Sequence, residues 1–214
     1  MNKKIVIIGA SGHGKVIADI AKNVGYEEII FLDDNCDLKK CGDYHIVGDV
    51  SKYIQYDCDM IIAIGNADTR KRIQSKVKEN GKILATLIHP AAVIGENVTI
   101  GDGTVVMAGA VVNAGSTIGE GCIINTCASV DHDCIIEDYV HVSVGAHLAG
   151  TVYVGENTWI GIGAVISNNI KIAANCTIGA GTVVIRDIVK QGVYVGVPAK
   201  MLVENKNEDS DHSE

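Results

Sequence analysis

One histidine of the chain is flanked on both sides by carboxylates, in the segment Val130-Asp131-His132-Asp133-Cys134. A neutral imidazole, with an ordinary pKa of about 6.5, can take a proton from an attacking amine or hydroxyl near neutral pH. A carboxylate on the other ring nitrogen would orient such a base and stabilise its imidazolium form. The alternative interpretation is a solvated histidine in a turn.

A glycine-rich segment near the N-terminus has the composition of a phosphate-binding turn. It reads Gly9-Ala-Ser-Gly-His-Gly-Lys15, directly after the apolar run 4–8 and before the helical spacing of 13–24. Such a turn brings backbone N–H groups and a helix N-terminus against a phosphate. The next apolar run, 28–32, ends in Asp33 and Asp34, which are placed to bond a ribose hydroxyl or a base edge.

The glycine order G-x-x-G-x-G differs from the dinucleotide order G-x-G-x-x-G, and the unit is small for a dinucleotide fold. A mononucleotide or sugar nucleotide therefore fits better than a nicotinamide cofactor. A turn that only packs helix on strand is the other interpretation. The predicted substrate-binding residues are Gly9, Ser11, Gly12, His13, Lys15, Asp33, Asp34, Gly65 and Asn66.

The elements around these residues indicate an α/β N-terminal domain over residues 1–87. Apolar runs predict strands at 4–8, 28–32, 60–64 and 82–87, and helical spacing predicts helices at 13–24 and 67–79. Strands alternating with helices are typical of a Rossmann-like βαβ unit with a parallel sheet.

A six-residue repeat fills residues 88–190. An aliphatic residue recurs at every sixth position from Ile88 to Val184, and a small or β-branched residue follows four positions later. This period predicts a left-handed parallel β-helix with a triangular coil of about 18 residues. Gly or Asn after the aliphatic residue is expected to supply the left-handed backbone at each corner. Cys122, Cys134 and Cys176 fall at interior positions and are interpreted as small apolar fillers.

Composition and charge argue against several classes of protein. The net charge of −8 argues against nucleic acid as a partner, and no apolar run is long enough for a membrane span. The seven cysteines show neither zinc-knuckle nor disulfide spacing, and the run Ile5–Ile8 is too short for a signal peptide, so a reduced, cytoplasmic protein is expected. Residues 191–203 form a C-terminal segment. The acidic stretch 204–214 is interpreted as a solvated, disordered end rather than an interaction tail.

The combination of GASGHGK, FLDD and NTCASVDHDC resembles the hexapeptide-repeat sugar-nucleotide acetyltransferases over residues 1–202. This group includes the bacillosamine-pathway UDP-4-amino-sugar N-acetyltransferases, the perosamine N-acetyltransferases and the sialic-acid O-acetyltransferases. The resemblance implies acetyl-CoA as co-substrate, no metal and a homotrimer. Zinc carbonic anhydrases share the β-helix but place two of their zinc-binding histidines five residues apart. The histidines of this repeat, at 89, 132, 141 and 147, are 43, 9 and 6 residues apart.

The resemblance also implies roles for single residues. His132 matches the general base and Asp133 its orienting acid, with Asp131 as competitor, and Asn125 matches a residue near the acceptor or the base. Gly150 resembles the backbone N–H donor to the oxyanion. His147 has no counterpart and is expected on the surface. Acetyl-CoA is expected to contact His141 and Gly150, a channel of Gly161, Ile162, Gly179 and Ala180, and Lys200 at a phosphate.

The sequence thus predicts direct acetyl transfer in a ternary complex, most simply to the amino group of a nucleotide-linked 4-amino-4,6-dideoxy sugar for bacterial surface glycans. One alternative is O-acetylation of sialic acid or another sugar. A second is a non-catalytic scaffold that binds a sugar nucleotide.

Overall fold

The computed structural model describes residues 3–202, and the acidic stretch 204–214 lies outside them. The N-terminal part is a three-stranded parallel sheet of order β2-β1-β5. Its strands are β1 (Lys4–Ile8), β2 (Glu28–Leu32) and β5 (Asp59–Ile62), and its helices are α1 (Gly12–Asn23) and α2 (Ala67–Glu79). The apolar runs predicted as strands form β1 and β2, and the helix predicted over 67–79 is α2.

Three features of this part differ from the sequence prediction. A short hairpin of β3 (Lys40–Cys41) and β4 (Tyr44–His45) and the 3₁₀ helix η1 (Val50–Gln55) were not predicted. The third strand ends at Ile62 instead of continuing to residue 64. The strand predicted over 82–87 is reduced to one bridge, between Met60 and Leu84. The chain leaves the sheet there because Leu87 pairs with Val105 of the β-helix.

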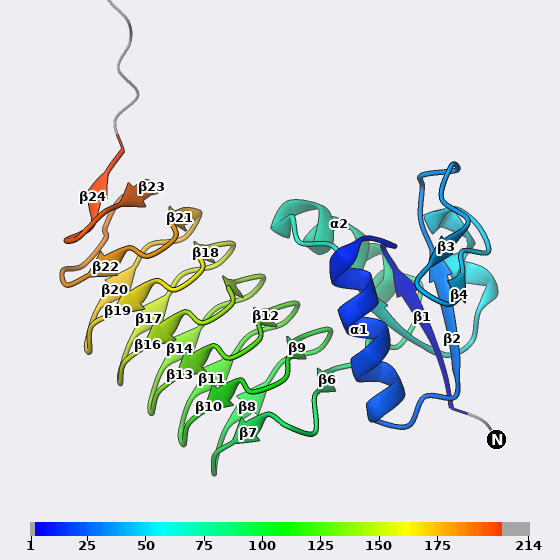
Figure 1. Ribbon diagram of the computed structural model, residues 1–214, viewed down its shortest axis with the longest axis horizontal. Helices are drawn as coiled ribbons and strands as arrows, with labels where there is room; N and C mark the ends of the chain where they lie inside the picture. The colour runs from blue at the N-terminus through cyan, green and yellow to red at the C-terminus, as the bar shows by residue number, and fades with distance from the viewer. Residues whose placement is uncertain (1–2, 203–214) are drawn as a thin grey trace, which may run out of the picture.

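The repeat forms a triangular parallel β-helix whose strands pair in register with residues 18 positions along, as Val112 pairs with Val130 (Figure 1). Its strands are β6 (Leu87–Ile88), β7 (Val93–Ile94), β8 (Thr99–Ile100), β9 (Val105–Val106), β10 (Val111–Val112), β11 (Thr117–Ile118), β12 (Ile123–Ile124), β13 (Ser129–Val130), β14 (Ile135–Ile136), β15 (His141–Val142), β16 (His147–Leu148), β17 (Tyr153–Val154), β18 (Trp159–Ile160), β19 (Val165–Ile166), β20 (Lys171–Ile172), β21 (Cys176–Ile178) and β22 (Val183–Val184).

Three sheets make the sides of this prism. The docking face consists of β6, β9, β12, β15, β18 and β21, continued by β23 (Gly192–Val195) and antiparallel β24 (Lys200–Met201). The second face holds β7, β10, β13, β16, β19 and β22, and the third face holds β8, β11, β14, β17 and β20. We call the turns between docking and second face the first corner, those between second and third face the second corner, and those between third and docking face the third corner. The second corner lies opposite the docking face.

The prism interior is aliphatic, as the repeat predicts. The stacked Val, Ile and Ala side chains are almost wholly buried, and Cys122, Cys134 and Cys176 lie among them. The glycine prediction was wrong in detail. The left-handed residues recur at every sixth position from Asn97 to Gly181, three places after the aliphatic residue and not directly after it.

The glycines that directly follow the aliphatic residue serve close packing between coils. A Cβ on Gly101 would lie 2.5 Å from the backbone nitrogen of Glu120 in the next coil. These positions therefore require glycine because neighbouring backbones approach there, and not because the backbone is left-handed.

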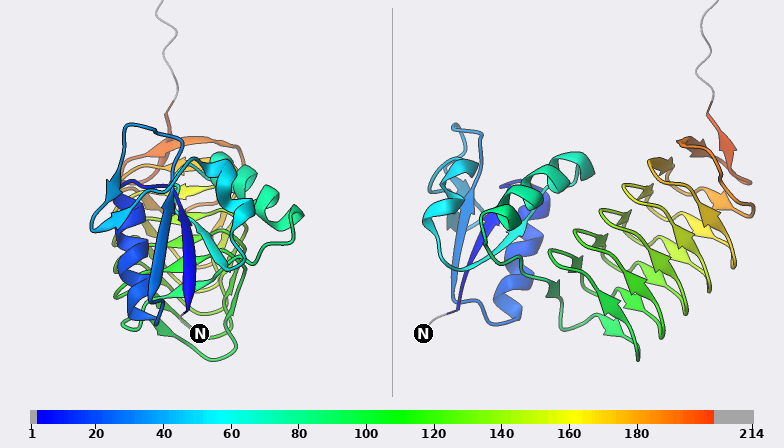
Figure 2. Two further views of the ribbon diagram at one scale, coloured as in Figure 1. Left: turned by 90° about the vertical axis from the view of Figure 1, so that its right-hand side faces the viewer. Right: turned by 180° about the vertical axis from the view of Figure 1, so that it is seen from behind.

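The N-terminal part packs on the docking face at one end of the prism (Figure 2). Leu87, Val105 and Ile123 project outward from that face into an apolar cluster that includes Ile17 and Ile20 of α1. Helix α2 covers the neighbouring third corner with polar contacts. Within residues 3–202, no helix is both long and apolar enough to cross a membrane.

Candidate active site

The predicted base, His132, lies in a turn of the second corner, between β13 and β14, with its side chain more than half exposed. Asp133 has φ 56°, and this left-handed turn brings its Oδ2 to 2.8 Å from His132 Nδ1. Asp131 instead accepts the His132 backbone N–H at 2.8 Å and the Asn113 amide at 2.9 Å. The hydrogen bond to Asp133, and then the charge of Asp131, raise the pKa of His132. Asp133 therefore holds the ring through Nδ1, and Nε2 has no hydrogen-bond partner among residues 3–202.

Gly150 lies one coil beyond His132 and touches its ring. A Cβ at position 150 would come within 2.5 Å of His132 Nε2, although Gly150 is not in the left-handed region. Its carbonyl accepts from Asn169, and no group among residues 3–202 accepts from its N–H. The structure thus places a free backbone donor beside the free imidazole nitrogen.

The remaining residues predicted to contact acetyl-CoA lie elsewhere on the prism. Four of them occupy the first corner on successive coils above Asn125, and Lys200 lies beyond the last coil in β24. Ile162 is 60% exposed, which leaves this corner open to a ligand. Within one chain, the first corner and the His132–Gly150 pair are therefore on different edges. The four residues are Gly161, Ile162, Gly179 and Ala180.

His141 lies next to Asn125 and not next to His132. It projects from β15 on the docking face, where its Nε2 lies 3.0 Å from Asn125 Nδ2. The ring of Trp159 stacks on His141, with centroids 5.6 Å apart and planes 4° apart. Burial, and then the positive charge of Arg70, lower the pKa of His141 to about 3, so its ring is neutral near pH 7. His147 is exposed on the second face, 2.8 Å from Ser129 Oγ.

Sequence reasoning missed Trp159 and Ser143, the residue that accepts from the Trp159 indole N–H. The repeat could have found Trp159, because it follows His141 by one 18-residue coil and is the only tryptophan of the chain. Ser143 carried no such signal.

The glycine-rich turn is tightly built. Gly9 has φ +112°, and a Cβ there would lie 2.7 Å from the carbonyl oxygen of Ala63. Ser11 precedes α1 without making a side-chain cap, and Ser11, Gly12 and Lys15 are exposed. The first N–H groups of α1 therefore remain available to an anion.

His13 is the least exposed polar residue predicted for this turn. Its Nε2 is buried without a hydrogen-bond partner among residues 3–202. Burial, and then the charge of Arg70, lower the pKa of His13 to about 4. Like His141, it is therefore neutral near pH 7.

The two aspartates predicted for nucleotide recognition also hold the backbone. Asp33 accepts the N–H of Ala10 at 2.7 Å and that of Asn35 at 2.8 Å, and Asp34 accepts that of Val50 at 2.9 Å. A carboxylate has about four acceptor positions, so both retain capacity for a ligand. Asn66 likewise caps α2 by accepting from Thr69 at 2.9 Å, next to Gly65.

A buried arginine fixes the turn after β5 against the β-helix. Arg70 of α2 is 1% exposed and donates only to backbone carbonyls. Two belong to Ile64 and Gly65, at 2.9 and 2.8 Å, and two to the third corner, Gly121 at 2.7 Å and Tyr139 at 2.8 Å. Burial lowers the pKa of Arg70 to about 10, so it stays charged at pH 7. We call this set of four bonds the Arg70 clamp.

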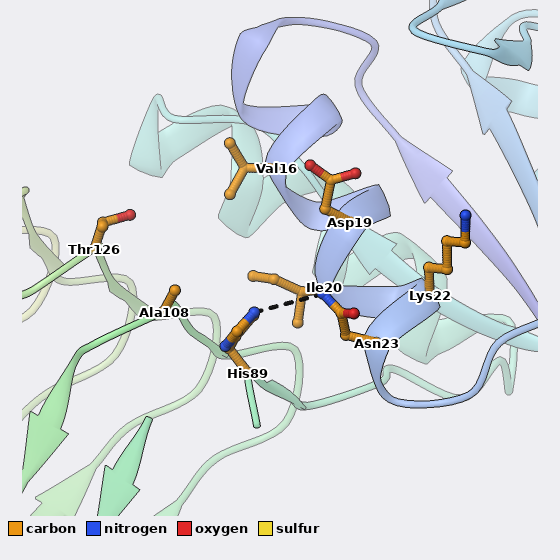
Figure 3. A pocket seen from close by; sticks show the side chains of 8 residues that line it. All are labelled: Val16, Asp19, Ile20, Lys22, Asn23, His89, Ala108 and Thr126. Atoms are coloured by element: carbon orange, nitrogen blue, oxygen red, sulfur yellow. Dashed lines mark hydrogen bonds between the residues drawn. The ribbon is translucent and has the colours of Figure 1, made fainter. Parts of the chain in front are cut away.

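Two cavities lie between the N-terminal part and the prism. The first, of about 420 Å³, is at the C-terminal half of α1, where Asn23 approaches His89, and it contains no residue predicted for the site (Figure 3). The second, of about 560 Å³, lies between the start of α2 and the docking face. It is lined by Gly65, Asn66, Ala67, Asp68, Tyr139, His141, Asn157, Thr158, Trp159, Asn175, Cys176 and Thr177. We call it the α2 cavity.

Among residues 3–202, no three His, Cys, Asp or Glu side chains come together as a metal site would require.

Comparison with known proteins agrees with this architecture. Residues 4–77 match the model of the PglD N-terminal domain, and residues 151–186 match that of the bacterial transferase hexapeptide, six repeats. UDP-N-acetylbacillosamine N-acetyltransferase of Bacillus subtilis is 36% identical over 112 residues, and the match spans 50% of this chain and about half (52%) of that protein.

Two solved structures match over nearly the whole chain. The acetyltransferase domain of PglB from Neisseria gonorrhoeae, in complex with acetyl coenzyme A, is 40% identical with a TM-score of 0.91, covering 94% of this chain and 100% of that one. PerB from Caulobacter crescentus, in complex with CoA and GDP-perosamine, is 36% identical with a TM-score of 0.88, covering 94% and 97%.

A βαβ unit docked on a hexapeptide β-helix is thus the architecture of a class of acetyltransferases. Within that class, the chain belongs to the family of sugar-nucleotide N-acetyltransferases that carry a PglD-type N-terminal domain.

Proposed function

We propose that this protein transfers an acetyl group from acetyl-CoA to the amino group of a nucleotide-linked 4-amino-4,6-dideoxy sugar. One observation carries the proposal: His132 is held through Nδ1 by Asp133 and presents Nε2 beside the free N–H of Gly150. The relatives support the substrate classes, since PglB was solved with acetyl coenzyme A and PerB with CoA and GDP-perosamine.

The chemistry follows from this geometry. The acceptor nitrogen attacks the thioester carbonyl carbon, and His132 Nε2 takes the proton that the nitrogen loses. Negative charge develops on the carbonyl oxygen, where the Gly150 N–H can donate to it. Collapse of the intermediate breaks the C–S bond, and the thiolate of CoA recovers the proton from the imidazolium. Asp133 stabilises that imidazolium throughout.

The active site we propose is shared between copies of the chain, arranged as a homotrimer. His132 lies on the second corner, opposite the docking face that carries the glycine-rich turn and His141. One chain therefore cannot bring its own base to its own nucleotide site. A neighbouring prism that presents its second corner to the first corner of this one would unite them, and would also remove water from the exposed His132.

Subunit mixing tests the shared site. His132→Ala and Lys15→Ala proteins, each impaired alone, should regain activity when they are unfolded and refolded together, because some sites then combine two intact halves. Activity no higher than the sum of the separate proteins contradicts sharing.

Release of free thiol from acetyl-CoA across a panel of nucleotide-linked amino sugars tests the activity. We expect release only with a 4-amino sugar, and an acetyl group on the product that survives mild alkali as an amide. An alkali-labile ester would indicate the O-acetyltransferase alternative. Tight binding of the sugar nucleotide without thiol release would indicate the scaffold alternative.

We further infer that the protein acts in the cytoplasm, since all seven cysteines are free thiols, as a reducing compartment allows.

A further inference from the structure

We propose that the first cavity, at the C-terminal half of α1, receives the acyl chain of the donor thioester, and that the protein accepts propionyl-CoA and butyryl-CoA as well as acetyl-CoA. We call this space, of about 420 Å³, the α1 cavity. The inference rests on the proposed function and widens its class of donor substrate.

One column of residues on the first corner joins the expected CoA channel to the α1 cavity. Ala108, Thr126, Val144 and Ile162 follow one another at intervals of one 18-residue coil. The carbonyl oxygen of each accepts a backbone N–H from the turn of the next coil, at 2.8–3.0 Å, so the turns are stacked directly on one another. Ile162 belongs to the expected channel, whereas Thr126 and Ala108 line the α1 cavity.

This order sets the direction in which a bound donor would lie. The expected channel and Lys200 are toward the C-terminal end of the prism, so pantetheine in that channel runs along the column toward Asn125, the residue expected near the acceptor or the base. The acyl chain of a thioester continues on the side of the carbonyl carbon away from sulfur. Any carbon beyond the acetyl methyl group therefore passes Thr126 and enters the α1 cavity.

The part of the cavity next to Thr126 is apolar and has room for a short chain. Val16 and Ile20 of α1 lie across from Ala108 and Thr126 (Figure 3). Successive coils are about 4.8 Å apart, so the step from Thr126 to Ala108 holds about two further carbon atoms of an extended chain. Ala108 contributes only a methyl group and leaves this step open.

A polar pair ends the apolar part of the cavity. Asn23 Nδ2 lies 3.5 Å from His89 Nε2, and His89 Nδ1 accepts the backbone N–H of Ala91 at 2.9 Å. An alkyl chain that reached this pair would remove water from polar groups without bonding to them. We therefore expect the fit to end at a chain of about four carbons, which hexanoyl-CoA exceeds.

The longer chain leaves the transfer chemistry unchanged. The acceptor nitrogen forms a bond to the thioester carbonyl carbon, the C–S bond breaks, and the proton lost by the nitrogen passes through His132 to the thiolate of CoA. In the proposed homotrimer, the second corner of a neighbouring copy covers the first corner. That contact would keep the alkyl chain out of water.

Calorimetric titration with acetyl-CoA, butyryl-CoA and hexanoyl-CoA tests the cavity without requiring turnover. Butyryl-CoA should bind about tenfold more tightly than acetyl-CoA, because two further methylene groups are buried. Hexanoyl-CoA should bind no more tightly than butyryl-CoA. Butyryl-CoA that binds no better than acetyl-CoA, or an affinity that keeps rising to hexanoyl-CoA as a nonspecific apolar contact would, overturns the assignment.

Variants that fill the cavity test its place in the fold. Ala108→Leu should abolish the preference for butyryl-CoA, because the larger side chain occupies the step below Thr126. Val16→Phe should do the same from the opposite wall, at a residue that is 39% exposed and so tolerates the change. Ala174→Leu is the matched control, since Ala174 holds the equivalent place in a turn of the third corner. A preference that survives both fillings, or is lost equally in the control, would refute the proposal.

Thiol release in the presence of the sugar nucleotide separates this proposal from the proposed function. Release with acetyl-CoA but not with propionyl-CoA or butyryl-CoA leaves the acetyltransferase standing and rejects the wider donor range. Tighter binding of butyryl-CoA without thiol release from any donor rejects the transferase and supports the α1 cavity as an acyl-binding site.

Discussion

Loss of the Arg70 clamp tests how strongly the turn after β5 is held against the β-helix. Arg70→Met keeps most of the side-chain volume but removes the donors to four carbonyls, two of them in buried bonds and two in partly buried ones. A buried polar group left without a partner costs about 1–3 kcal/mol. Against this, the charged guanidinium no longer suffers desolvation. Its pKa of about 10, lowered from 12.5, corresponds to roughly 3 kcal/mol at about 1.4 kcal/mol per tenfold change in protonation.

At about 2 kcal/mol for each of the two buried carbonyls and about 1.5 kcal/mol for each of the two partly buried ones, the lost bonds cost about 7 kcal/mol. Less the roughly 3 kcal/mol of desolvation, the net destabilisation is about 4 kcal/mol, which for a chain of this size lowers Tm by roughly 10 °C. Arg70→Lys keeps a charge but lacks the planar fork, so it should recover only part of the loss. Scanning calorimetry measures both, with Arg72→Met as the control, since Arg72 is an exposed residue of the same helix.

The clamp also fixes the Gly65-Asn66 turn, so the proposed function adds a kinetic expectation. In Arg70→Met assayed below its Tm, KM for the sugar nucleotide should rise severalfold, whereas KM for acetyl-CoA should change little. A Tm shift under about 3 °C, or equal changes in both KM values, would refute the reasoning.

Three further predictions concern other parts of the site. Gly150→Ala should lower kcat at least about tenfold with unchanged Tm, because its Cβ displaces the His132 ring; an unchanged kcat in the thiol assay would contradict this. Asp133→Asn should move the His132 pKa down toward about 6.5 in an NMR titration, because the bond to Asp133 raises it; a pKa that stays in place would show that Asp133 does not hold the ring. The folded-state pKa values of His13 and His141, about 4 and about 3, lie below the unfolded value, so the unfolded state binds more protons and stability should fall as pH drops below about 6.5. His141→Asn should lose less Tm than wild type between pH 7 and pH 5, and an equal loss in both would exclude His141 as a source of the acid sensitivity.

The β-helix could be predicted from the sequence because each coil restricts the residue types at the same positions. Only slim aliphatic side chains fit the interior, so every sixth position carries the signal, and Cys134, which the repeat places inside, is 0% exposed. The position of the left-handed residues was predicted wrongly because a coil needs glycine for two reasons. Gly101 allows the backbones of two coils to approach closely, and Gly103 adopts the left-handed conformation. The amino-acid sequence alone does not show which of the two reasons applies to a given glycine.

The site could be predicted only where its residues are near in sequence. His132 and Asp133 are adjacent, and Gly150 follows by one coil, so the repeat places them together. Arg70 contacts Gly121 and Tyr139 across 51 and 69 residues, and no local pattern carries such a contact. The strand predicted over 82–87 failed for a related reason, because a partner in the β-helix draws the chain away at Leu87.

The most direct test of the central claim is kcat of His132→Ala against wild type, at saturating acetyl-CoA and sugar nucleotide and at a fixed alkaline pH where the acceptor amine is abundant. His147→Ala is the control, since it replaces an exposed histidine of the same prism. The account predicts a loss of about 10²–10⁴ for His132→Ala, with oligomer size and acetyl-CoA affinity preserved, and little loss for His147→Ala. A His132→Ala protein with near wild-type kcat would contradict the account and remove His132 from the mechanism.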